Sequence, residues 1–292
     1  MRLNFLLSAF VALLFLAGCS SSSQLTSLKT NAETFANAGD YSQAYTVWNS
    51  YLEQTPVETV SGDEFAKAAQ TAYKAGQSQK ALSWFDQARY KNFSSADMYK
   101  TLAAIYHDQD NLSKELTALE FYTENYGNAD QQINIRLFSI YTEIADYVKA
   151  EEYWDLMGED ARKQEANLVK YLGVSQKLEK DELADSVATE ILKLNPDQAD
   201  ALDRMAKKYY WAGQNRYDSE MKKYEQNKTR KQYKILLEEL DKVTVDFKKA
   251  LPYLEKLWKQ NPGKEYAAYF ANIYARFGDE QKAEYYKTYL KQ

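Results

Sequence analysis

A recurring two-helix pattern is the feature that most limits what this chain can fold into. Its clearest copy is Glu165–Gln198, where apolar side chains recur three and four residues apart over two consecutive segments. The two predicted helical faces consist of Leu168, Tyr171, Leu172 and Ser175, and of Leu183, Ala184, Val187, Ala188, Ile191 and Leu192. Pro196 closes the unit, because the residue before a proline is disfavoured in helical geometry. The pattern recurs along the chain, which predicts an all-α fold built from helix pairs.

The spacing of the pattern, roughly 34 residues, resembles that of tetratricopeptide (TPR) repeats. In the first pair, Ala32 and Ala44 stand where the two helices would cross, since only small side chains allow close approach. Trp48 would fill the gap to the next pair, and Pro56 would end the second helix. The resemblance implies one continuous TPR-type helical solenoid of about seven helix pairs over residues 25–292.

The sixth pair carries about thirty extra residues between Gln214 and Phe247. Two acid-first i,i+4 pairs and the lack of proline favour helix in this stretch. We therefore predict a long helical hairpin insertion over residues 216–247, with both helices of the pair prolonged until they meet at Asn227–Thr229. Each arm would gain roughly sixteen residues, or ~24 Å. Gly213 leaves a break in the first arm open, because glycine costs about 1 kcal/mol relative to alanine.

An apolar stripe on the second arm predicts how the hairpin packs. The stripe consists of Leu236, Leu240, Val243 and Phe247. It would bury against the first arm, at Met221 and Tyr224. The tip is basic, and its candidate partner-binding residues are Lys222, Lys223, Lys228, Arg230, Lys231 and Lys234. These cations are expected either to be solvated or to contact an acidic partner, anionic lipid head groups or an anionic glycan.

In TPR proteins the first helix of each pair lines a concave surface, and its outward positions bind ligands. The resemblance places these groove candidates on that surface: Tyr73, Lys74, Lys100, His107, Glu143, Lys177, Lys207, Tyr210 and Trp211. Tyr209–Trp211 holds too many adjacent aromatic side chains for one buried helical face. At least one of Tyr210 and Trp211 is therefore expected to be exposed or to be covered by the insertion.

The N-terminus has the features of a targeting signal. Arg2 precedes an apolar run, Phe5–Ala17, that is shorter than the ~20 residues needed to span a bilayer. The run leads into Leu16–Cys19, which resembles the lipobox of bacterial lipoproteins. The resemblance implies a signal peptide over residues 1–18, lipidation of Cys19 with acyl chains such as palmitate, and a Ser-rich tether over residues 19–24. An ordinary secretory signal followed by a chance cysteine is the alternative.

The residue after the cysteine bears on localisation. In lipoproteins of diderm bacteria, an aspartate there marks retention in the inner membrane, whereas this chain has Ser20. We therefore expect anchoring in the outer membrane through Cys19, with more than one acyl chain giving stable attachment. The tether lacks the acidic residues that resemble a surface-export signal, so the body is expected to face the periplasm.

The chemistry that the chain lacks argues against catalysis. With a single cysteine, Cys19, and a single histidine, His107, no internal disulfide forms and a His/Cys metal site is nearly excluded. We find no Gly-rich phosphate loop, no His-Glu-x-x-His and no G-x-S-x-G. We expect no enzyme and no cofactor. The formal net charge of −5, with mixed signs, does not suggest a nucleic-acid partner.

These features favour a lipid-anchored, non-enzymatic TPR scaffold or adaptor of the bacterial cell envelope. It would bind an envelope protein partner through its concave face or its helical insertion. The alternative is a glycan-binding lipoprotein of a nutrient-uptake system, in which aromatic side chains such as Tyr210 and Trp211 would stack on sugars.

Overall fold

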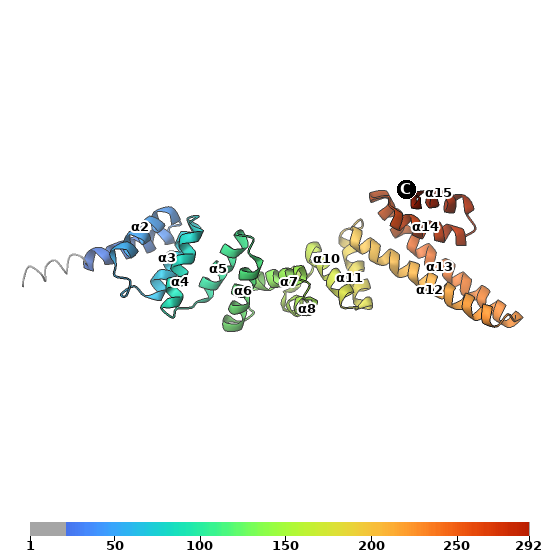
Figure 1. The fold of residues 1–292 in the computed structure, drawn as a ribbon, viewed down its shortest axis with the longest axis horizontal. Helices are drawn as coiled ribbons and strands as arrows, with labels where there is room; N and C mark the ends of the chain where they lie inside the picture. The colour runs from blue at the N-terminus through green and yellow to red at the C-terminus, as the bar shows by residue number, and fades with distance from the viewer. Residues whose placement is uncertain (1–21, 292) are drawn as a thin grey trace, which may run out of the picture. The chain divides into compact units, whose positions relative to one another are not determined.

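The computed structural model describes residues 22–291, and all regular secondary structure within them is helical (Figure 1). The predicted signal peptide and Cys19 lie outside the described residues. The chain divides into two compact units, Met1–Asp130 and Gln131–Gln292. In each unit, successive antiparallel helix pairs pack on one another. The predicted fold class, all-α with TPR-type helix pairs, is therefore confirmed.

The N-terminal unit contains three helix pairs. The first pair is formed by the helix over residues 22–37 and by α2 (Tyr41–Gln54), the second by α3 (Gly62–Lys74) and α4 (Ser78–Tyr90), and the third by α5 (Ala96–Asp108) and α6 (Leu112–Tyr126). The first helix includes residues 22–24, so the prediction that these three belong to a tether is wrong. Residues 22–24 are exposed, and the Thr26 hydroxyl donates a hydrogen bond to the Ser22 carbonyl at 3.0 Å within this first turn.

Short turns and N-caps set the ends of these helices. Gly39 and Gly76 both have φ near +80°, the left-handed region that glycine enters without a steric penalty. Ser61 and Glu64 form a reciprocal capping box, in which each side chain accepts a hydrogen bond from the other residue's backbone N–H. Alanines at the crossings are fully buried, which lets the paired helices approach closely. They are Ala32, Ala44, Ala69 and Ala81.

The C-terminal unit begins with the fourth and fifth pairs. The fourth consists of α7 (Gln131–Glu143) and α8 (Tyr147–Leu156), and the fifth of α10 (Glu165–Lys177) and α11 (Asp181–Leu194). A short helix that the sequence did not predict, α9 (Glu159–Arg162), joins them. The ring of Trp154 stacks on that of Tyr171 with centroids 3.9 Å apart, so aromatic packing links the two pairs.

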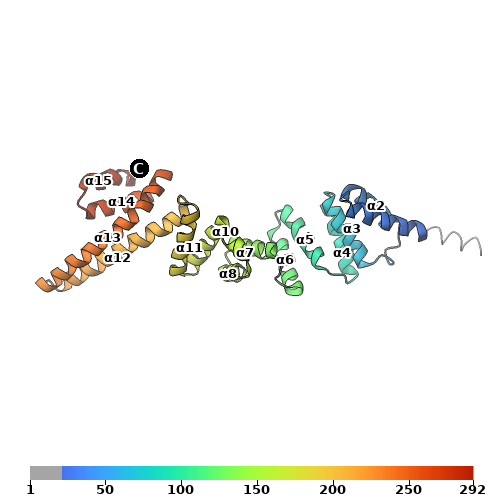
Figure 2. The same cartoon turned by 180° about the vertical axis from the view of Figure 1, so that it is seen from behind.

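The sixth pair is the long hairpin, and it extends beyond the neighbouring pairs of its own unit in both views (Figures 1 and 2). Its helices are α12 (Ala199–Gln226, 28 residues) and α13 (Arg230–Gln260, 31 residues). The arms meet at Asn227–Thr229, as predicted. The last pair, α14 (Lys264–Arg276) and α15 (Glu280–Leu290), packs against the hairpin base.

Gly213 does not break the hairpin's first arm. The helix runs through it, and a Cβ built there would lie 2.9 Å from Cε1 of Phe247. Phe247 is fully buried, so the missing side chain at position 213 lets the two arms approach around its ring. The glycine therefore serves packing in the hairpin, at the cost of some helix propensity.

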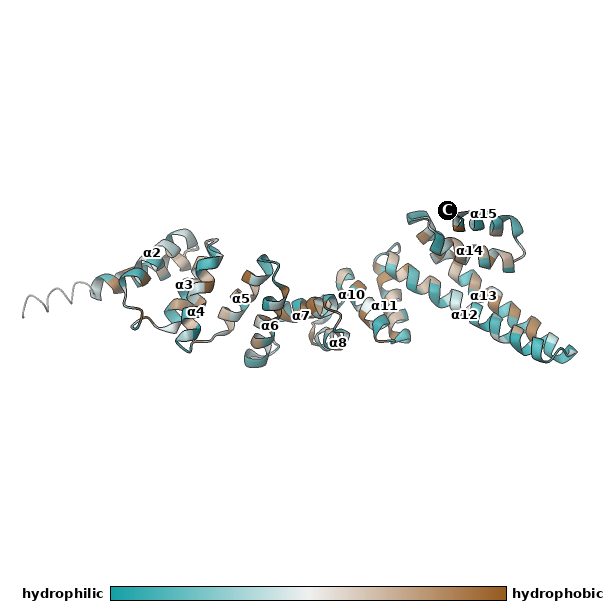
Figure 3. Ribbon diagram, viewed as in Figure 1, coloured by the Kyte–Doolittle hydropathy of each residue, from teal (hydrophilic) through white to brown (hydrophobic). Residues whose placement is uncertain are grey.

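The hairpin's interior follows the predicted stripe closely. Leu236 and Val243 are buried and Leu240 is half-buried, as the sequence predicted. Hydrophobic and hydrophilic residues are interspersed along the hairpin (Figure 3). The ring of Tyr224 lies 5.7 Å from that of Tyr233, so it packs near the tip.

No helix among residues 22–291 combines the length and apolar character needed to cross a membrane.

Candidate functional site

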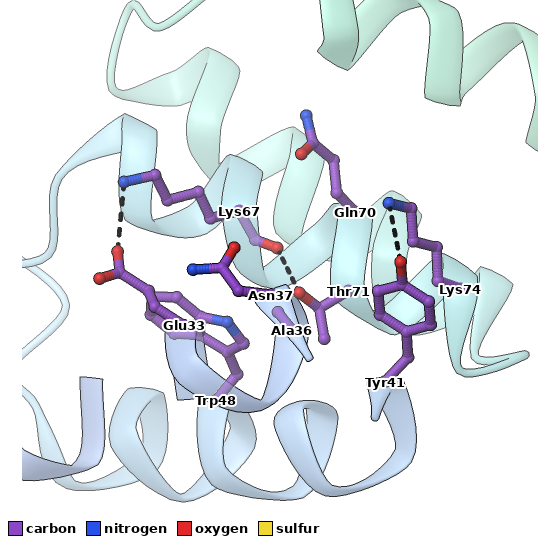
Figure 4. Close-up of a pocket in the computed structure, with 9 residues that line it drawn as sticks. All are labelled: Glu33, Ala36, Asn37, Tyr41, Trp48, Lys67, Gln70, Thr71 and Lys74. Atoms are coloured by element: carbon purple, nitrogen blue, oxygen red, sulfur yellow. Dashed lines mark hydrogen bonds and ion pairs between the residues drawn. The ribbon is translucent and has the colours of Figure 1, made fainter. Parts of the chain in front are cut away.

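The N-terminal unit has a pocket of about 370 Å³ between the helix over residues 22–37 and α3 (Figure 4). Both are the first helices of their pairs, so the pocket lies on the surface that the TPR resemblance assigned to ligands. Its lining residues are Glu33, Ala36, Asn37, Tyr41, Trp48, Lys67, Gln70, Thr71 and Lys74. Trp48 is buried and forms the apolar floor, whereas most of the other side chains are polar.

Two lysines flank the pocket on opposite sides (Figure 4). The Lys67 ammonium lies 3.2 Å from Glu33 and 3.0 Å from Asp63, and its bond to Asp63 is the main cause of its raised pKa. The Lys74 ammonium is held more weakly, 3.5 Å from the Tyr41 hydroxyl and 4.8 Å from the centre of that ring. Lys74 is therefore the cation with more capacity to bind an added anion.

Two side-chain amides lie between these lysines, on Asn37 and Gln70 (Figure 4). Neither amide makes a hydrogen bond to another residue of the described chain. Each amide offers one carbonyl acceptor and two N–H donors, the same groups that a peptide backbone presents. The pocket can therefore form paired hydrogen bonds with an extended peptide segment.

An ion pair at a buried carboxylate joins the two helices that form the pocket. Glu64 on α3 accepts bonds from Lys29 at 2.8 Å and from the Tyr51 hydroxyl at 3.0 Å. Burial alone would raise the pKa of Glu64, but the bonds from Lys29, Ser61 and Tyr51 outweigh it and lower that pKa to about 2. Burial and the same carboxylate raise the pKa of Tyr51 to about 12. This network joins the helix over residues 22–37, α2 and α3.

The remaining groove candidates of this unit occupy separate positions. Tyr73 donates to Asp108 on α5 at 2.8 Å, and burial together with that carboxylate raises its pKa. Lys100 forms a 2.5 Å ion pair with Asp130. His107 is exposed, and its Nδ1 lies 3.4 Å from the buried Glu115 carboxylate. Only Lys74 of the predicted set lines the pocket.

The candidates in the C-terminal unit also differ from one another. Glu143 and Lys177 are exposed. Lys207 bridges Asp203 at 2.9 Å and Glu265 at 2.8 Å. Burial works against its charge, but the bonds to the two acids outweigh burial and raise its pKa. Lys207 therefore ties α12 to α14.

The aromatic pair divides as expected, with one exposed member. Trp211 is 47% exposed, whereas Tyr210 is 6% exposed. The Tyr210 hydroxyl accepts a hydrogen bond from Asn272 on α14 at 2.5 Å, and its ring packs on Tyr269. Tyr210 is thus a core residue, and its prediction as a groove contact is wrong, because its position faces the last helix pair.

All six predicted tip cations are exposed. Lys223 pairs with Glu220 at 2.5 Å, and Lys228 with Glu225 at 2.6 Å. The remaining four form no ion pair with a carboxylate of residues 22–291. They are Lys222, Arg230, Lys231 and Lys234.

Sequence reasoning missed Asn37, Lys67 and Gln70 as pocket residues. Lys67, Gln70 and Lys74 lie three, four and seven residues apart, which places them on one helical stripe opposite the alanines of α3. That spacing was available from the sequence. The position of Asn37 was harder to anticipate, since it depends on how the first two pairs pack.

Among residues 22–291, no cluster of His, Cys, Asp and Glu is placed to hold a metal ion.

The architecture defines the chain as a TPR-type helical-repeat protein, and solved structures share that fold. A putative protein-binding protein from Bacteroides ovatus matches at 20% identity and TM-score 0.51, covering 75% of this chain and all of that one. YrrB, described as a TPR protein with an unusual peptide-binding site, matches at 14% identity and TM-score 0.48, covering 60% of this chain and 89% of its own.

A TPR protein from Parabacteroides merdae matches at 12% identity and TM-score 0.47, over 91% of this chain and 93% of that one. No protein-family model and no curated protein sequence matches the chain. At 20% identity, the likeness to the Bacteroides ovatus structure is one of fold alone.

Proposed function

We propose that this chain is a lipid-anchored, non-enzymatic TPR scaffold of the bacterial cell envelope that holds a protein partner. The partner segment would bind in the pocket between the helix over residues 22–37 and α3. The anchor would be acylated Cys19 in the outer membrane, with the body facing the periplasm. Two of the structures with a similar fold carry descriptions as a protein-binding and a peptide-binding protein, which supports this class of function.

The observation that carries the proposal is the pair of unbonded amides beside Lys74. Asn37 and Gln70 can each pair with one peptide group, so together they favour an extended segment over a helix, whose backbone groups are already bonded. The weakly held Lys74 ammonium adds a preference for an acidic side chain or a terminal carboxylate.

The buried Glu64 network lowers the cost of binding. It fixes both walls of the pocket before the partner arrives, so little conformational entropy is lost on association. The Glu33 carboxylate and the Lys67 ammonium bond to each other at 3.2 Å, so the groups best placed to contact a ligand are the two amides and the Lys74 ammonium. These groups suit hydrogen bonding to a peptide segment.

Site-specific crosslinking in cells tests the pocket. A photo-crosslinking amino acid replaces Gln70, and a matched chain carries it at Gln87, a half-buried glutamine on the second helix α4. The proposal predicts one dominant protein adduct from position 70 and little from position 87. Combining position 70 with Asn37→Ala and Lys74→Ala should remove that adduct. Equal adducts at both positions, or none at position 70, would contradict the proposal.

The anchor needs its own experiment. The Leu16–Cys19 sequence supports acylation, so cells fed an alkyne-bearing palmitate should label the wild-type protein and fail to label Cys19→Ala. Density fractionation of the labelled cells should place the protein with the outer membrane. A labelled Cys19→Ala variant, or an unlabelled wild type in the soluble fraction, would remove the lipoprotein assignment.

Glycan capture is the second candidate function, and one observation favours it. The indole of Trp211 is 47% exposed on α12 and could stack on a sugar ring. Its edge-on contact with Tyr210 holds it in place. A glycan array should then give signals that Trp211→Ala loses. An array without signals would leave the protein scaffold as the supported function.

A further inference from the structure

The tip of the α12–α13 hairpin differs in charge from the rest of the chain. Residues 222–234 contain six lysines and arginines against one acid, Glu225, although the whole chain has a formal net charge of −5. Further along α13 the sign changes, because Glu238, Glu239 and Asp241 follow within two turns. The positive charge is therefore confined to the end of the hairpin.

Most of this charge is not neutralised within the protein. Lys223 and Lys228 have acidic partners, whereas Lys222, Arg230, Lys231 and Lys234 form no ion pair with residues 22–291. Four exposed cations at one end of the hairpin produce a local positive potential that favours contact with an anionic surface.

Apolar side chains are exposed on the same turns of α13. Tyr233 is 48% exposed, Ile235 is 37% and Leu237 is 46%. Leu236 and Val243 supply the buried face of this arm, and Tyr233 adds only a partial contact with the Tyr224 ring, so much of the apolar surface of these three side chains stays exposed. Tyr233 and Ile235 lie on either side of Lys234 in the sequence, and Leu237 follows one turn later.

Exposed cations together with exposed apolar side chains indicate which kind of surface the hairpin tip would bind. Cations and apolar side chains on a convex tip match the interface of a lipid bilayer, where ammonium groups contact phosphates and apolar side chains enter between head groups. We propose that the hairpin tip docks on an anionic lipid bilayer.

Membrane docking by the hairpin tip is a function beyond that of the scaffold, and its residues differ from those that line the groove. The groove would hold the partner, while the tip would bring α12 and α13 against the membrane. Membrane contact by the tip does not depend on the acyl chains at Cys19, so it is measurable in their absence.

The test uses the full chain with Cys19→Ala and Gln226→Cys, so that the only thiol lies in the exposed last residue of α12. An environment-sensitive dye on that thiol reports the polarity at the tip. Vesicles of phosphatidylcholine alone and vesicles that also contain phosphatidylglycerol are then added. We expect a blue shift only with phosphatidylglycerol and a loss of the shift in high salt.

Two matched variants show whether the tip carries the effect. Lys231→Glu with Lys234→Glu should weaken vesicle binding at least tenfold, since each cation near an anionic bilayer contributes roughly a fivefold change. Lys248→Glu with Lys259→Glu makes the same change of charge at exposed sites nearer the base of α13 and should leave binding unaltered.

Three results would overturn the proposal. The first is equal shifts with both vesicles, which would indicate attachment through the apolar N-terminus alone. The second is equal loss of binding in both variants, which would indicate a general charge effect. The third is no shift with phosphatidylglycerol, which would leave an acidic protein or an anionic glycan as the ligand of the tip.

Discussion

The second and sixth helix pairs are both antiparallel helical hairpins, but they bury their side chains against different neighbours. Helices α3 and α4 have 13 residues each, and α3 contacts α2, α4 and α5, so alanines along its whole length are buried. Helices α12 and α13 are about twice as long. Their base packs on α14 through Phe247, Leu254 and Phe270, whereas residues 218–240 of the outer half contribute nothing to that core cluster.

The difference shows how much each pair depends on its neighbours. A short pair is buried by the pairs before and after it, as in other repeat arrays. The outer hairpin must bury its apolar residues within itself, and it leaves Tyr233 and Leu237 exposed. Local stability should therefore decrease from the base of the hairpin toward its tip. More side-chain surface is exposed toward the tip and is available for binding.

Truncating the hairpin core should have the largest effect at its base. Phe247 is fully buried and packs on both Tyr210 and Phe277, so Phe247→Ala should cost about 3–5 kcal/mol. Leu236→Ala, in the outer half, should cost about 2 kcal/mol, the lower end for a buried leucine. Denaturant unfolding followed by circular dichroism measures both values. A larger cost at Leu236 would reverse the proposed gradient.

The Glu64 network should give the short pairs a pH-dependent contribution to stability. Because the pKa of Glu64 is about 2 when folded and near 4.5 when unfolded, its contribution is present above pH 4.5. It is lost as the pH falls from 4.5 toward 2. The contribution should be roughly 2–3 kcal/mol, allowing for partial solvent screening at Lys29.

Unfolding free energies of wild type and Glu64→Gln, measured across this range, check the expectation. The difference between the two proteins should be largest near neutral pH and should shrink on acidification. Glu58→Gln, at an exposed carboxylate, serves as the control. A difference that stays constant with pH would mean that the Glu64 carboxylate is not specially stabilised.

The crossing of a short pair should tolerate little added volume. Ala184 on α11 is fully buried, so Ala184→Leu should cost about 1–3 kcal/mol through overpacking. Ala212→Leu makes the same substitution at an exposed helical position and should change stability by less than about 0.5 kcal/mol. Thermal melts that do not distinguish Ala184→Leu from wild type would show that residue 184 is not at a tight crossing.

Local patterns predicted the elements of this fold well. The alanine positions and the turn at Asn227–Thr229 follow from helical spacing and propensity, which act between residues close in sequence. The prediction for Tyr210 failed because it depended on a contact between residues far apart in sequence. Adjacent helical residues point about 100° apart, and which of Tyr210 and Trp211 faces inward depends on α14, about sixty residues later.

The candidate site was only partly predictable. Lys74 was identified from its place on a first helix, but the pocket also needs Asn37 and Gln70 from two different pairs. Their proximity arises from packing between repeats, which the register of one repeat does not specify. The ion pair of Lys207 with Glu265 was missed because it too joins different pairs. The ion pair of Lys100 with Asp130 was missed because Asp130 lies in the segment after α6, outside the repeat pattern.

Charge reversal at the hairpin tip should have the smallest effect on stability. Lys231 and Lys234 are exposed and form no ion pair with residues 22–291, so Lys231→Glu with Lys234→Glu should shift the unfolding free energy by less than about 0.5 kcal/mol. Chemical denaturation of this double variant beside wild type measures the shift. A loss well above 1 kcal/mol would show that these cations stabilise the hairpin itself.

The central claim is that the groove of the N-terminal unit binds the partner, independently of the hairpin. The most direct measurement is the yield of the position-70 crosslink in a chain that lacks residues 216–244 and has its two arms joined by a short turn. We predict a folded protein with an adduct yield equal to that of the full chain. A folded deletion variant that no longer forms the adduct would contradict the claim and place partner binding on the insertion.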